Sequence, residues 1–150
     1  MKIQRIKMAN NYFTLPFDSK KIITNKDHTK CDIKHSIAHH IHLITTSYFG
    51  ECTFDDSFGC SIWDIDFDNL SSTNKIKSII IDSLTNSLKK HESRIHKLDI
   101  NALIKQEEIA VLDNSNVVKK KVTISIKGKI RKTNEDFHYT EYFYIGPLSF

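Results

Sequence analysis

The stretch Lys89-Lys90-His91-Glu92-Ser93-Arg94-Ile95 marks the point where the hydrophobic period of this chain changes from that of a helix to that of a strand. Its three leading basic residues suit the partial negative charge at a helix C-terminus. Glu92 does not, because an exposed carboxylate at that end is disfavoured by roughly 0.3–1 kcal/mol. The glutamate therefore calls for a specific cation, either Arg94 or a cation of another chain. The alternative is a solvated charge pair at a helix end.

Two amphipathic helices are predicted before this stretch. In residues 73–90 the apolar side chains fall in one broad arc, which predicts a helix with a core-facing side: Ile76, Ile79, Ile80, Ile81, Leu84 and Leu88. Ser71 or Ser72 is its expected N-cap. Residues 32–48 carry a second stripe at spacings of four and three: Ile33, Ile37, Ile41, Ile44 and Tyr48.

After the stretch the apolar residues recur at every second position, as in a strand. The alternation begins near Ile95 and is clearest over residues 121–131, where four apolar side chains share one face: Val122, Ile124, Ile126 and Ile130. A third strand is expected from Phe137 to Ile145, with aromatic residues on both faces that favour cover on both sides. The predicted fold class is α+β, with two amphipathic helices packed on a small, mainly antiparallel sheet. A further short strand is expected from Ile62 to Phe67.

Length and composition indicate one domain with a modest core. The chain has 150 residues, 39% of them hydrophobic. Residues 1–30 are polar and are predicted to be an N-terminal extension, whose apolar island Tyr12–Phe17 docks on the domain or on a partner, whereas residues 31–150 form the domain. The formal net charge of +4 is unevenly placed, since residues 50–70 lack Lys and Arg while residues 117–132 lack Asp and Glu. Two surfaces of opposite sign are expected, although a charge run is more often a solvated face.

The expected location is cytoplasmic. The basic N-terminus is not followed by an apolar segment of the kind that directs secretion, and no window approaches the length of a membrane-spanning helix. Three cysteines, Cys31, Cys52 and Cys60, make an odd count, which favours reduced thiols. Cys52 and Cys60 nevertheless flank a loop and are close enough in sequence to meet.

Several segments together resemble a known family. The string from Leu88 to Ile95 is similar to the Glu-Pro-Arg signature of the contractile-tail baseplate wedge family, which includes the TssE component of type VI secretion baseplates. Three further blocks resemble that family: Asp32–Ile37, Leu43–Glu51 followed by Phe58-Gly59, and the closing Tyr144–Pro147. The resemblance covers about residues 30–147. Ser93 stands where the family signature has Pro, so the fixed φ of the turn is lost.

The resemblance implies a structural, non-enzymatic subunit of a contractile injection machine that links wedge proteins to the sheath. The implied partners are the wedge proteins TssF and TssG and the sheath proteins TssB/TssC, without cofactor, nucleic acid or membrane insertion. Glu92, Ser93 and Arg94 are the expected partner-binding residues, with both charged side chains projecting together from the helix end. The alternative is a lysozyme-like glycoside hydrolase, for which Glu51 with Glu92, or Glu51 with Asp55, are the candidate carboxylates.

Other chemistry is weakly supported. The run Asp64–Asn69 begins like a calcium loop but lacks the required Gly and the final Glu. His35, His39 and His42 share one helix face, where a surface stripe is favoured over a metal site. No cysteine is set in a nucleophile motif, and four glycines leave little capacity for a phosphate loop. The lysines between Lys119 and Lys132 are typical of a solvated strand face, which disfavours nucleic-acid binding.

Overall fold

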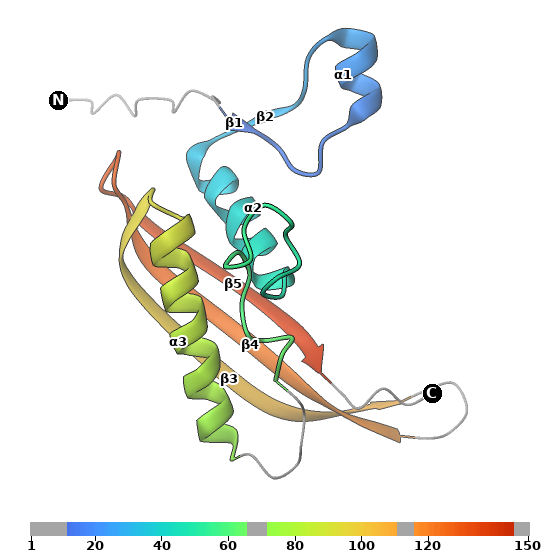
Figure 1. Cartoon of the computed structure of the whole chain (residues 1–150), viewed down its shortest axis with the longest axis vertical. Helices are drawn as coiled ribbons and strands as arrows, with labels where there is room; N and C mark the ends of the chain where they lie inside the picture. Colours follow the sequence, from blue (N-terminus) through green and yellow to red (C-terminus); the bar gives the residue numbers. More distant parts are fainter. Residues whose placement is uncertain (1–11, 66–71, 111–115, 146–150) are drawn as a thin grey trace, which may run out of the picture. The chain divides into compact units, whose positions relative to one another are not determined.

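The computed structural model describes residues 12–65, 72–110 and 116–145 (Figure 1). The chain separates into two compact units, Met1–His42 and Leu43–Phe150, with the division inside one helix. The boundary predicted at residue 30 stays a prediction. In the described ranges no helix combines enough length and apolar character to cross a lipid bilayer.

The N-terminal unit contains a small ladder and a short helix that sequence reasoning missed. Strands β1 (Tyr12–Phe13) and β2 (Lys30–Cys31) pair antiparallel, and α1 (Ser19–Asn25) lies between them in the chain. The carboxylate of Asp18 caps α1 by accepting a bond from the backbone N–H of Lys21 at 3.1 Å. The helix buries no residue, so the hydrophobic period that reveals longer helices is missing here.

Helix α2 (Ile33–Thr46) confirms the first predicted helix. Its stripe is buried as expected at Ile33, Ile37, Ile41 and Ile44. Tyr48 is wrongly included in that stripe, because the helix ends at Thr46 and the tyrosine is 49% exposed.

Helix α3 (Thr73–His91) confirms the second predicted helix and contacts the first long strand (Figure 1). Ser72 is its N-cap, accepting from the backbone N–H of Lys75. The core-facing arc is narrower than predicted: Ile76, Ile80, Leu84 and Leu88 are buried, whereas Ile79 is 39% exposed.

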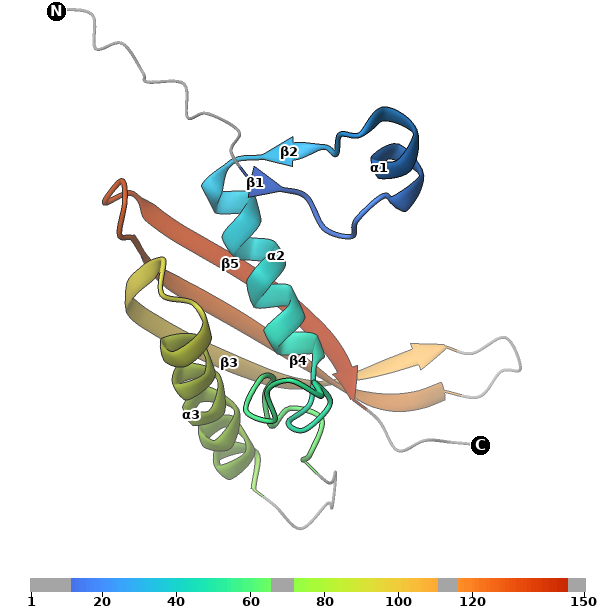
Figure 2. The same ribbon diagram turned by 45° about the horizontal axis from the view of Figure 1, so that its top comes forward.

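The C-terminal unit is built on a three-stranded antiparallel sheet (Figure 2). Its strands are β3 (Ile95–Ala110), β4 (Asn116–Ile130) and β5 (Asp136–Ile145), in that spatial order. The core face carries alternate residues of β4, and four are buried as predicted: Val122, Ile124, Ile126 and Ile130. The α+β class is thus confirmed. The expected cover on both faces of the third strand is not found, because Tyr142 and Tyr144 are exposed.

A β-bulge near the start of β3 changes the phase of the strand. Ile95 pairs with Ile130 and Ile100 pairs with Ile126, so the register shifts between His96 and Asp99. An extra residue in one strand lets the odd-numbered Ile95 and the even-numbered Ile100 face the same core. Lys97 lies within the bulge and adopts a positive φ of 53°.

The segment between α2 and α3 is held down by specific contacts. Residues 61–64 form turns, so the predicted strand from Ile62 is wrong, and Phe67 lies outside the described residues. Ile62 is nevertheless fully buried. The indole N–H of Trp63 donates to the carbonyl of Thr45 at 2.9 Å, and the Trp63 ring meets Phe143 edge to face. None of the three cysteines is in a disulfide.

Candidate functional site

Glu92 and Arg94 form a closed ion pair at the turn between α3 and β3. Oε1 of Glu92 accepts from the backbone N–H of Arg94 at 3.0 Å and from Nε at 2.8 Å, while Oε2 accepts from Nη2 at 2.5 Å. The Glu92 side chain is 1% exposed and the Arg94 side chain 29% exposed. The glutamate thus finds the cation that its place at a helix end calls for, within its own chain.

The expectation that both charged side chains project from the helix end is therefore wrong for Glu92. The physical reason is the helix stop itself. The backbone N–H of Glu92 still bonds to the carbonyl of Leu88 at 2.9 Å, so Glu92 is the C-cap of α3 and its carboxylate remains inside the turn. Ser93, between the two charged residues, is exposed.

Arg131, just after β4, closes the turn from the other side. Its backbone N–H donates to the carbonyl of Arg94 at 2.8 Å, and its Nε donates to the carbonyl of Ser93 at 2.8 Å. Residues nearly forty positions apart in the chain thereby fix one turn. These two bonds hold the turn in one conformation.

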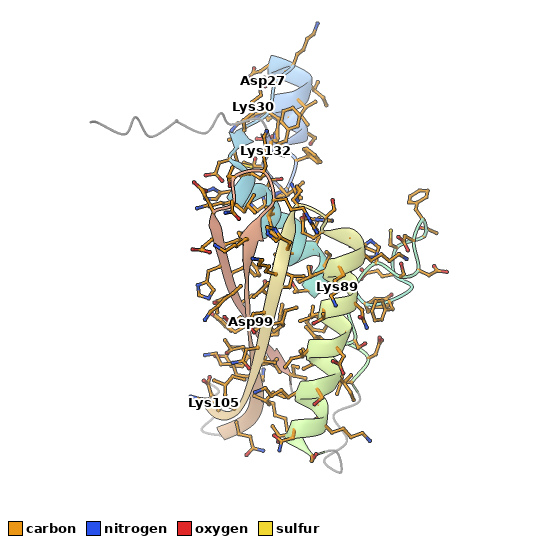
Figure 3. The ribbon with its side chains drawn as sticks, turned by 90° about the vertical axis from the view of Figure 1, so that its left-hand side faces the viewer. Asp27, Lys30, Lys89, Asp99, Lys105 and Lys132 are labelled. Carbon is orange, nitrogen blue, oxygen red and sulfur yellow. The ribbon has the colours of Figure 1, made fainter. Side chains whose placement is uncertain are left out.

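A pocket of about 670 Å³ opens beside this turn. It lies between α3 and β3, and Figure 3 shows Lys89 on α3 with Asp99 and Lys105 along the neighbouring β3. Its lining includes three exposed cations, Lys89, Lys97 and Arg131. The one carboxylate in the lining is Glu92, whose charge Arg94 balances.

A second cluster, which joins the loop to the end of α3, has the composition of a catalytic triad. Oδ1 of Asp55 accepts from the hydroxyl of Ser57 at 2.5 Å, and Ser57 Oγ lies 3.4 Å from Nε2 of His91. Lys90 also donates to the Ser57 hydroxyl. In a triad the carboxylate orients the histidine and leaves the nucleophile free.

Here the same Asp55 oxygen also accepts from the backbone N–H of Ser57 at 3.0 Å, as in a local turn. These bonds hold the pKa of Asp55 below its ordinary value, with the Ser57 hydroxyl contributing most. The cluster therefore has a structural role, which is to hold the loop against the end of α3.

A family comparison decides the family to which the fold belongs. The family model for the baseplate wedge protein gp25 matches residues 31–135, which include α2, α3 and the turn. The chain belongs to the gp25 baseplate wedge family. This is a family of structural baseplate proteins, so the suspected resemblance is confirmed and a structural role in a contractile-tail baseplate follows.

The gp25 fold also has a counterpart of known structure. A crystal structure from Geobacter sulfurreducens, provisionally described as a tail lysozyme, matches with a TM-score of 0.57 and 20% sequence identity. The match covers 82% of this chain and 100% of that one, and at this identity it supports the fold alone. No curated protein matches.

The carboxylates proposed for glycoside hydrolysis all have structural partners in this gp25 member. Oε2 of Glu51 accepts from the backbone N–H of Tyr48 at 3.1 Å, and Asp55 holds Ser57. Both oxygens of Glu92 accept from Arg94, so a general acid at Glu92 would first have to break the ion pair.

The histidine stripe on α2 is also engaged elsewhere. His35 Nδ1 lies 2.9 Å from Asp32, and His39 Nδ1 accepts from the backbone N–H of Leu15 at 3.3 Å. Among the described residues no group of three or more His, Cys, Asp or Glu is arranged to hold a metal ion.

Sequence reasoning found the turn between α3 and β3 and missed the residues that surround it. The alternation that begins near Ile95 predicts a regular strand through Lys97, and the alternation over residues 121–131 predicts a second regular strand that ends with Arg131. The bulge that redirects Lys97 and the bond from Arg131 to Ser93 both depend on strand pairing. Neither position carries a local signal of that pairing. A positive φ at a lysine is uncommon, so the sequence itself gave no reason to expect it.

Proposed function

We propose that this chain is a wedge subunit in the baseplate of a contractile injection machine of the type VI secretion kind, equivalent to TssE, and that it links wedge proteins to the sheath. The family membership supports the structural role. The observation that carries the partner contact is the turn itself, which is locked by Glu92 and Arg131 yet presents Ser93 and part of Arg94 to solvent.

The three signature residues take different roles in this proposal. Glu92 is the buried member that holds Arg94 in one conformation. Ser93 and the exposed edge of Arg94 are the surface that a partner contacts. The missing proline of the family signature is compensated by the hydrogen bond from the Nε of Arg131 to the carbonyl of Ser93.

The proposed partners are the wedge proteins TssF and TssG and the sheath proteins TssB/TssC, in the cytoplasm. The N-terminal residues before 31 lie outside the family match. Phe13 and Phe17 are 52% and 60% exposed. We therefore place at these two residues any contact that this chain does not share with its family, and we place the contact shared by the family at the signature turn.

Co-purification from cells that produce the wedge and sheath proteins tests this function. The tagged chain is expected to recover baseplate wedge and sheath proteins. Ser93→Trp is expected to keep the fold and lose the wedge proteins, because the new ring covers the exposed middle of the turn. Ser78→Trp, at an exposed position on α3 far from the turn in sequence, is the matched control and is expected to recover them.

Two results would contradict the proposal. Recovery of no baseplate protein by the wild-type chain would remove the assembly role. Normal recovery by Ser93→Trp would remove the turn as the contact. We also expect no peptidoglycan hydrolysis by the purified chain, and hydrolysis that disappears in Glu51→Gln would favour the hydrolase instead.

A further inference from the structure

The pocket beside the signature turn has an uneven charge that the structural role of the turn does not explain. Lys89 comes from the last turn of α3, Lys97 from the bulge in β3, and Arg131 from the residue after β4. A basic residue at a helix C-terminus is accounted for by the helix dipole, which covers Lys89. Lys97 is not on that helix and needs another reason, and the bond to Ser93 accounts for only one of the three guanidinium nitrogens of Arg131.

Neither Lys89 nor Lys97 is neutralised by a carboxylate of the described residues. Across the described ranges, the ammonium groups of Lys89 and Lys97 take part in no ion pair, whereas Lys90 on the next position pairs with Asp55 at 3.8 Å. Arg131 uses only its Nε to bond the carbonyl of Ser93, and this bond fixes the direction in which its two terminal nitrogens point. Three cations that border one pocket repel each other unless an anion lies between them.

The backbone places one of these cations at a local cost. Lys97 has a φ of 53°, which lies in the left-handed region that a residue with a Cβ seldom adopts. A bulge redirects a side chain that a regular strand would have placed on the opposite face. Gly128, opposite the bulge, permits it, since a Cβ there would lie 3.1 Å from the carbonyl oxygen of His96.

We infer that this pocket binds an acidic segment of a partner protein, through salt bridges from Lys89, Lys97 and Arg131 to two or more carboxylates. The inference rests on the proposed assembly role and names the chemistry of the partner at that same turn. Ile95 and Leu98 add an apolar floor, so the segment carries an aliphatic residue between its acids. A volume of about 670 Å³ accommodates several side chains, as ligand pockets of roughly 300–1,000 Å³ do.

The test uses the full chain and three labelled probes. The first is a fluorescent peptide of alternating glutamate and leucine, the second is its glutamine counterpart, and the third is single-stranded oligothymidine of similar charge. Fluorescence anisotropy measures each affinity in low salt. We expect the glutamate peptide to bind, the glutamine peptide to bind at least about tenfold more weakly, and added salt to weaken the first.

Charge-reversal variants locate the binding. Lys97→Glu with Arg131→Glu is expected to weaken the glutamate peptide at least about tenfold. The matched control is Lys75→Glu with Lys77→Glu, at the other end of α3, which alters net charge equally and is expected to change the affinity less than about twofold. Circular dichroism and the melting temperature confirm that each variant is folded.

The outcomes separate this inference from the proposed function. Equal loss in both double variants, or tighter binding of oligothymidine than of the glutamate peptide, would overturn the acidic-segment assignment. Co-purification decides the other question independently. A Lys97→Glu, Arg131→Glu chain that still recovers wedge proteins at the wild-type level leaves the assembly role standing and overturns the pocket as the contact.

Discussion

Arg94 donates three hydrogen bonds to the carboxylate of Glu92, from its backbone N–H, its Nε and its Nη2, although only one residue separates the two. The pair is asymmetric, because the glutamate side chain is 1% exposed and the arginine side chain 29%. Water reaches one partner and not the other. The two truncations should therefore differ.

We predict that Arg94→Ala destabilises the chain more than Glu92→Ala. The first leaves a buried carboxylate without its cation, at about 3–5 kcal/mol. The second leaves a partly hydrated guanidinium, at about 1–3 kcal/mol. Urea unfolding measures both. Adding Glu92→Gln to Arg94→Ala should restore part of the loss, and wild-type stability in both single variants would show that the pair is not an internal brace.

Two glycines of the family-like segments make a matched comparison. Gly59 has a φ of 127°, and an added Cβ would lie 2.8 Å from the carbonyl oxygen of Ser47. Gly50 has a φ of 83° and open space around it. Gly50→Ala should cost only the backbone strain, about 1–2 kcal/mol. Gly59→Ala should add about 1–3 kcal/mol for overpacking, and equal melting temperatures would contradict the close approach.

The start of α2 gives a prediction about pH. The backbone N–H of His35 donates to Asp32 at 2.8 Å and, as the largest cause, lowers the pKa of that carboxyl. A depressed folded pKa stabilises the fold above the unfolded pKa of about 3.9 and loses that contribution as the pH falls through the folded pKa. Asp32→Ala should therefore cost about 1 kcal/mol near neutral pH and less in acid.

Thermal unfolding followed by circular dichroism measures this difference at neutral and acidic pH. Asp82→Ala, which removes an equal charge from an exposed position on α3, is the control. A loss of stability in Asp32→Ala that grows as the pH falls would contradict a stabilising bond from the His35 N–H to the Asp32 carboxylate.

Thiol reactivity should separate the three cysteines. Burial raises the pKa of Cys60 to about 11, and its side chain is fully buried beside the carbonyl of Thr45. Cys31 is also buried, whereas Cys52 is partly exposed. Iodoacetamide at mildly alkaline pH should alkylate Cys52 first, as read by peptide mass spectrometry. In concentrated urea all three cysteines should react. Early labelling of Cys60 in the folded protein would mean that the segment between α2 and α3 does not bury this thiol.

The long elements were predictable because each repeats one physical signal many times. The stripe from Ile33 to Ile44 and the alternation from Val122 to Ile130 each require one period over several turns or pleats. A single misplaced residue, such as Tyr48 or Ile79, changes the edge of such a pattern and leaves its type intact. The α+β class followed from these patterns, and the family from the turn together with the three further blocks that resemble it.

Short and non-local features were not predictable. Ile62 is buried by a chain of turns that has no period, so an apolar residue in an acidic segment was mistaken for strand. At the site, the sequence shows a carboxylate and a guanidinium two positions apart, but no pattern in it indicates how deeply either side chain is buried. Arg131, which closes the turn, is brought to it by the pairing of β3 with β4.

Trp63 is the one tryptophan of the chain, and its indole N–H donates to the carbonyl of Thr45 while its ring meets Phe143 edge to face. Its fluorescence emission therefore reports one event, the attachment of the segment between α2 and α3 to the sheet. Loosening of that segment would shift the emission to longer wavelength while the far-ultraviolet helix signal stayed constant. When a partner is titrated, the emission wavelength of Trp63 therefore shows whether this segment is released on binding.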